Sequence, residues 1–283
     1  RRRPAPLAGP MKTLTRRRWM LSLTTGLLAC ALTLAWWLAG NALRPVGLYT
    51  GWLLLGLLLG LALFNARKKL PFLPLLSAST WLQLHIYVGW LACAVFALHA
   101  GLRPPGGRLE FVLWLVFLLV AGSGIFGLWL SRWLPPRLAR SGESLVYERI
   151  PRLGRELEVE ALALVRQAEA ETQSTTLADF YLRVLGTYFT RRPALLAPLA
   201  GDDARHHRVI TELAALRRFL NQRESALADQ LGELLEAKRN LDAQWAGQRL
   251  LKLWLFGHIP LTYGLLVLVG AHLWLVLHYA HRL

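Results

Sequence analysis

Long apolar runs follow one another along this chain, separated by polar stretches. Five apolar runs are separated by short basic or Pro/Gly-rich links, except that a long polar stretch lies between the fourth and fifth runs. The runs cover about 19–39, 48–64, 80–101, 110–131 and 250–280. Because about 20 apolar residues in a helix cross the hydrocarbon core of a bilayer, each run predicts a membrane-spanning helix. We therefore expect an all-α membrane protein with five transmembrane helices.

The spans and links divide the chain into four predicted regions. We expect a basic cytoplasmic segment, four spans, an inserted helical cytoplasmic domain and a last span, over 1–18, 19–133, 134–248 and 249–283. Met11 is a candidate start residue, and the first apolar run is too long for a cleaved signal, so we expect it to be an anchor.

The inserted region predicts three helices. Two cover 154–171 and 175–190, and a third is expected to begin near His206 and to run almost unbroken into the last span. Leucine recurs at every seventh position of this third helix, at Leu213, Leu220, Leu227, Leu234 and Leu241. Such a repeat predicts packing against another helix. We favour a hairpin with 154–190, and the alternative is a helical partner or a second copy that binds through 206–248.

The charge is strongly positive, with 33 Lys and Arg against 17 Asp and Glu, a formal net charge of +16. The basic residues flank the apolar runs, so topology and anionic headgroups explain them and nucleic acid is not expected as a partner. One side of the membrane collects most of them, namely Arg16, Arg17, Arg18, Arg67, Lys68, Lys69, Arg132, Arg137, Arg140 and those of the whole 134–248 region. The positive-inside rule then predicts a cytoplasmic N-terminus and a periplasmic C-terminus in a bacterial cytoplasmic membrane.

Two spans carry histidines at matched spacing. His85 and His99 are 14 residues apart in the third span, and His258 and His272 are 14 apart in the fifth. In a helix this is about 21 Å along the axis and about 40° in azimuth. Since both spans run from inside to outside, His85 is level with His258 and His99 with His272. Each pair can supply both axial ligands of one haem iron, so the sequence predicts two stacked b-type haems.

Residues near the histidines suit such cofactors. Gly89 lies one turn after His85, where a missing side chain would let a macrocycle approach the helix. Arg103 and Arg108 are candidate partners for the propionates of the outer haem, and the inner haem has Lys68, Lys69 and Arg132. The sequence GSGIFG at 122–127 is a literal G-x-G-x-x-G, but it lies inside a span without a preceding strand, so it does not indicate a dinucleotide site. We expect these small residues to lie against a haem or a neighbouring helix. His206 and His207 show no metal-ligand pattern and are predicted on the surface.

The pattern of His85, His99, His258 and His272 resembles the haem-bearing core of the cytochrome b family of quinol–cytochrome oxidoreductases. Its placement on the third and fifth spans is also similar to the ferric reductase and NADPH oxidase superfamily. The resemblance covers about 48–131 and 250–281, and it implies low-spin haems that transfer electrons. The inserted helical domain and the lack of flavin, nicotinamide and cluster motifs make the chain a divergent member.

These features predict a subunit of a membrane oxidoreductase complex that carries electrons between the quinone pool and a periplasmic redox partner. A multihaem c-type cytochrome or an iron–sulfur subunit is the expected partner, because the outer loops are short. One alternative is a ferric-reductase-like carrier fed by a separate cytoplasmic flavoprotein. Another is a haem-free membrane scaffold or signalling protein that uses its leucine-repeat helix as a relay.

Overall fold

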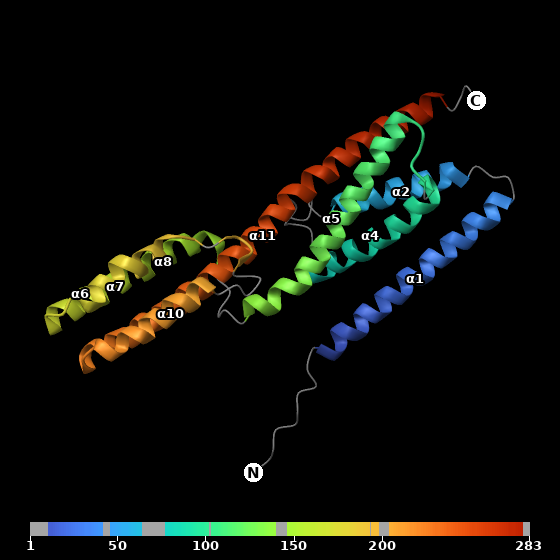
Figure 1. The fold of residues 1–283 in the computed structure, drawn as a ribbon. Coiled ribbons are helices and arrows are strands. Elements are labelled where there is room, and N and C mark those ends of the chain that lie inside the picture. Colours follow the sequence, from blue (N-terminus) through green and yellow to red (C-terminus); the bar gives the residue numbers. More distant parts are fainter. Residues whose placement is uncertain are drawn as a thin grey trace, which may run out of the picture. The chain divides into compact units, whose positions relative to one another are not determined.

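The computed structural model describes residues 11–41, 46–63, 77–101, 103–139, 146–192, 194–197 and 204–279, and within them the chain is helical without strands (Figure 1). It divides into two compact units. One contains Arg1–Leu128 and Gly257–Leu283, and the other contains Trp129–Phe256. The predicted borders of the inserted domain, at 134 and 248, lie a few residues inside this second unit.

The first unit contains the apolar helices. They are α1 (Met11–Asn41), α2 (Val46–Ala62), α4 (Ala78–Ala100), the first part of α5 (Arg108–Ala139) and the last part of α11 (Gln222–Tyr279). Four of these described helices are long and apolar enough to cross a membrane, namely α1, α4, α5 and α11. At 17 residues α2 is shorter, about 26 Å. Four of the predicted spans are therefore helices with the length and apolar character that crossing a membrane requires, and a span at α2 stays a prediction.

The ends of α4 follow from local chemistry. Ser77 is the N-cap, and its hydroxyl accepts a hydrogen bond from the backbone N–H of Thr80 at 3.3 Å. This satisfies one of the N–H groups that a helix start leaves without an intrahelical acceptor. The helix ends at Gly101, whose φ of 75° suits glycine. The helix expected at 80–101 therefore agrees with the structure.

The core of the first unit is a layer of apolar side chains contributed by several of its helices. Val95 is fully buried, Leu265 is almost so, and the rings of Phe96 and Phe117 stack with their centroids 3.7 Å apart. These residues come from α4, α11 and α5, and Leu54 and Leu58 of α2 join them. This layer therefore packs α4 and α11, which carry the histidines, against α5 and α2.

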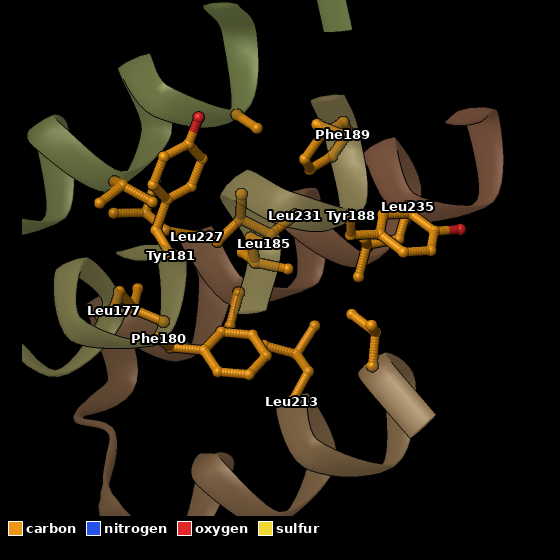
Figure 2. Packing of buried hydrophobic residues seen from close by; sticks show 14 of the residues in the cluster. Leu177, Phe180, Tyr181, Leu185, Tyr188, Phe189, Leu213, Leu227, Leu231 and Leu235 are labelled. Atoms are coloured by element: carbon orange, nitrogen blue, oxygen red, sulfur yellow. The ribbon is translucent and has the colours of Figure 1, made fainter. Parts of the chain in front are cut away.

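The second unit is a helical hairpin with its own core (Figure 2). It contains α6 (Ile150–Thr172), α7 (Thr176–Phe180), the π-helical turn η3 (Tyr181–Leu185), α8 (Gly186–Thr190), α10 (Ala204–Leu216) and the first part of α11. Figure 2 shows Leu213 and Leu227 packed among Leu185, Phe180 and their neighbours. The leucine face therefore packs within the chain, as the hairpin interpretation predicted.

The predicted long helix from His206 is wrong at one point. It breaks at 217–221, where α10 gives way to the short helix η4 (Arg217–Phe219), and α11 begins only at Gln222. The side chain of Asn221 accepts from the backbone N–H of Glu224 at 2.9 Å, and the Glu224 carboxylate accepts from the N–H of Asn221 at 2.8 Å. This reciprocal capping box starts a new helix. From there α11 continues without a break into the last predicted span, as expected.

His206 is also not on the surface, contrary to the prediction. It is 9 % exposed, its Nδ1 lies 2.9 Å from the hydroxyl of Tyr188, and its Nε2 lies 2.9 Å from Glu236. The reason is periodicity, because positions 206, 209 and 213 share the buried face of α10. His207 is exposed as predicted.

A second polar contact in this unit is the pair of Lys238 and Asp242 on α11. The ammonium lies 2.6 Å from Oδ2 of the carboxylate, and the lysine side chain is only 4 % exposed. Burial lowers the pKa of Lys238 and raises the pKa of Asp242, although each partner favours the charged form of the other. A buried pair of this kind has to keep both partners to be tolerated.

Candidate functional site

The four histidines of the predicted site lie on two helices of the first unit, His85 and His99 on α4 and His258 and His272 on α11. All four side chains are partly buried. His85 lies close enough to His258 for the two imidazoles to interact electrostatically, and the same is true of His99 and His272. The two members of each predicted pair are therefore within range of electrostatic interaction, and their joint binding of an iron stays a prediction.

The ring of His258 is held by α5. Its Nδ1 lies 2.6 Å from Oγ of Ser123, and the same hydroxyl donates to the backbone carbonyl of Val120 at 2.8 Å. An imidazole that binds a metal through Nε2 keeps its proton on Nδ1, and in that tautomer Nδ1–H of His258 donates to Oγ while the hydroxyl donates to Val120. In a neutral imidazole the lone pair then belongs to Nε2, which is the nitrogen available to a metal. A Cβ at Gly124 would lie 3.8 Å from the same ring.

The ring of His99 is held by α2 in a similar way. Its Nδ1 lies 3.1 Å from the carbonyl oxygen of Gly47 and 3.1 Å from Oγ1 of Thr50. A carbonyl can only accept, and the Thr50 hydroxyl donates to the carbonyl of Val46 at 2.9 Å. Nδ1–H is therefore the donor here too, and Nε2 carries the lone pair. The ring also lies close to α2, since a Cβ at Gly51 would be only 3.0 Å from its Cε1.

The two pairs are separate sites. They are about 21 Å apart along the helices, and the apolar layer of Val95, Phe96, Phe117 and Leu265 lies between them. Leu265 is the midpoint of the two histidines on α11, and 1 % of it is exposed. Each pair thus has its own polar surroundings, with low-dielectric packing between them.

A haem with two histidine ligands needs two Nε2 atoms and a flat space beside the helices, and the residues present fit these needs. In each pair one histidine has its Nδ1 hydrogen-bonded, which orients the ring. A Cβ added at Gly89 would meet no described atom within 4 Å outside its own stretch of helix. The backbone of α4 packs closely against those of α2 and α1. In the described chain, packing this close is not found between α4 and α11, the two helices that carry the histidines.

A further observation concerns Trp81, one turn before His85 on α4. Its Nε1–H is buried and has no hydrogen-bond acceptor among the described residues. A buried indole N–H usually has a partner. An acceptor supplied by a bound group, such as a haem propionate, would satisfy it.

The cationic residues predicted near the propionates are less informative. Arg103 and Arg108 have exposed side chains, in the turn after α4 and at the start of α5. Lys68 and Lys69 lie outside the described residues. Arg132 is exposed and belongs to the second unit.

Sequence reasoning missed Ser123, Thr50, Gly51 and Trp81. Ser123 did carry a signal, because it lies in the GSGIFG segment that was expected to face a haem or a neighbouring helix. The structure places this segment inside α5, with Ser123 and Gly124 against His258. Thr50 and Gly51 are ordinary residues of an apolar helix, and nothing in the pattern of α2 singles them out.

In the described chain no group of three or more His, Cys, Asp or Glu side chains could hold a metal ion. A bis-histidine haem requires only two protein ligands for each iron. Comparison with family models, with curated proteins and with solved structures finds no match for this chain.

Proposed function

We propose that this chain is a dihaem b-type cytochrome subunit that carries electrons across a membrane. His85 and His258 would ligate one haem iron, and His99 and His272 the other. One observation carries the proposal. In each pair the two imidazoles are within range of electrostatic interaction, and one of them has its Nδ1 within hydrogen-bond distance of a protein oxygen, an arrangement that leaves its Nε2 for a metal.

Bound haem would supply reversible one-electron chemistry, because two histidines fill both axial positions of the iron. The residues of this chain have simpler tasks. The four histidines hold the irons, Ser123 and Gly47 orient two of the rings, and the layer around Val95 and Leu265 excludes water between the sites. Trp81 and the arginines Arg103 and Arg108 are candidates to bind propionates.

The proposed redox partners and the proposed orientation in the membrane rest on the sequence. The distribution of Arg and Lys supports a cytoplasmic N-terminus in a bacterial cytoplasmic membrane. The short outer loops favour docking of a periplasmic multihaem c-type cytochrome or iron–sulfur subunit. A membrane quinone is the simplest counterpart on the other side, because the domain at 134–248 lacks flavin, nicotinamide and cluster motifs.

The optical spectrum of the detergent-purified full chain tests this function. The sample is recorded air-oxidised and dithionite-reduced, and haem is counted as the pyridine haemochrome against protein concentration. About two b-type haems per chain with a sharp low-spin α band are expected. A colourless protein after expression with ample haem would refute the proposal and leave the scaffold or signalling alternative.

A further inference from the structure

Ser123 makes the most direct contact with a histidine of the site. Its hydroxyl lies 2.6 Å from Nδ1 of His258, while the two oxygens at Nδ1 of His99 are each 3.1 Å away. The contact with Ser123 is thus shorter than either contact at His99, where a carbonyl and a hydroxyl both lie near Nδ1. Short hydrogen bonds are stronger than long, shared ones.

The environment of Ser123 strengthens this bond. Its O–H donates to the carbonyl of Val120 at 2.8 Å, inside α5. A hydroxyl that donates becomes a better acceptor, because hydrogen bonds in a chain polarise one another. The chain runs from the carbonyl of Val120 through Ser123 to the imidazole of His258, and it joins α5 to α11.

An acceptor at Nδ1 affects more than the direction of the ring. It draws the proton away from the imidazole and raises the basicity of Nε2, and a more basic axial ligand favours the oxidised iron. The effect grows as the hydrogen bond shortens. The two pairs of histidines therefore differ in the electron donation expected from their rings.

We propose that Ser123 is a positioning residue for the His85–His258 site, where it fixes the tautomer and rotation of His258 and lowers the reduction potential of the haem bound there. This inference rests on the proposed function. It assigns a role to a hydroxyl on α5, a helix that carries none of the four ligands. The two haems would then differ in reduction potential although both have two histidine ligands, because the hydrogen bonds at Nδ1 differ between the two sites.

The test is a redox titration of the full chain with two haems, as wild type and as Ser123→Ala, Ser123→Thr and Thr262→Ala. Thr262 is the matched control, because its hydroxyl also lies beside His258 but donates to the backbone carbonyl of that residue at 2.9 Å. The wave of the His85–His258 haem is identified by its loss in His258→Ala. We expect Ser123→Ala to move this wave to higher potential and leave the other in place. Ser123→Thr keeps the hydroxyl and should return the wave toward the wild-type position.

The outcomes separate this inference from the proposed function. A Ser123→Ala protein with two haems and unchanged waves would overturn the role of Ser123 and leave the dihaem function intact. An equal shift in Thr262→Ala would also overturn it, because that shift would reflect general disturbance of α11. If Ser123→Ala loses only the His85–His258 haem and Ser123→Thr regains it, the positioning role is supported. A wild-type protein without haem would refute both proposals.

Discussion

Gly51 offers the sharpest test of how α2 supports the His99 site. A Cβ at this position would lie 3.0 Å from Cε1 of His99, 3.6 Å from Nδ1 and 3.8 Å from Nε2. Carbon atoms in good contact are about 3.5–4.0 Å apart. In Gly51→Ala the ring therefore has to move by a few tenths of an ångström, although the carbonyl of Gly47 and the hydroxyl of Thr50 hold its Nδ1.

Two energies oppose each other in this variant. Alanine in place of glycine inside a helix is favourable by about 1 kcal/mol. Overpacking of a filled site costs about 1–3 kcal/mol, so the bundle itself should lose at most about 2 kcal/mol. The site is more sensitive than the fold, because a functional ligand has to be held within about 0.5 Å of its working position. We therefore expect Gly51→Ala to weaken the His99–His272 haem far more than it weakens the helices.

Gly56 is the matched control on the same helix. A Cβ there meets no described atom within 4 Å, so Gly56→Ala gains the same helix propensity without touching a histidine. The assay counts haem per chain by pyridine haemochrome and follows helix melting by circular dichroism in detergent. Gly56→Ala should keep two haems and melt no lower than wild type, whereas Gly51→Ala should fall toward one haem. If Gly51→Ala keeps both haems with an unchanged spectrum, the packing of His99 against α2 is not as described.

Three further predictions concern the pairing of the histidines, the core of the second unit and the loss of stability at low pH. His85→Ala and His258→Ala should each remove the same haem and spare much of the other, and equal loss of both haems in a folded variant would contradict the pairing. Leu231→Ala, at a fully buried position, should lower the free energy of unfolding by about 2–5 kcal/mol, while Leu182→Ala, 77 % exposed, should change it by at most about 0.5 kcal/mol; similar denaturant midpoints for the two variants would refute this core. Hydrogen bonds from Arg223 on α11 hold the pKa of Glu171 at about 2, below the ordinary 4.5. The ion pair of Glu171 and Arg223 therefore stabilises the fold above pH 4.5, and this contribution is lost as the pH falls toward 2. The difference in Tm between wild type and Glu171→Gln should shrink over that window, and a constant difference would show that the ion pair does not stabilise the fold.

The helices and the spacing of the histidines along each of them could be predicted from the sequence because both depend on fixed helix geometry, whereas the pairing between helices stays a prediction. The rise and turn of a helix set where His85 and His99 lie relative to each other, whatever surrounds them. The break before α11 was missed because the leucine repeat continues across it, from Leu213 to Leu227. The capping box of Asn221 and Glu224 was present in the sequence and competes with that repeat. A local signal of helix ends should therefore take precedence over a periodic signal that spans it.

The hydroxyls that hold the histidines could not be predicted in this way. In an apolar helix a Ser or Thr hydroxyl commonly donates to a carbonyl three or four residues earlier, and several here do so: Thr24, Thr25, Thr33 and Thr262. Ser123 and Thr50 make the same local bond, and in addition their oxygens reach an imidazole on another helix. That second contact depends on how α5 and α2 are rotated about their axes, and apolar spans carry little pattern that sets the rotation. The candidate ligands of this site follow from spacing within one helix, whereas the residues that orient them follow only from packing between helices.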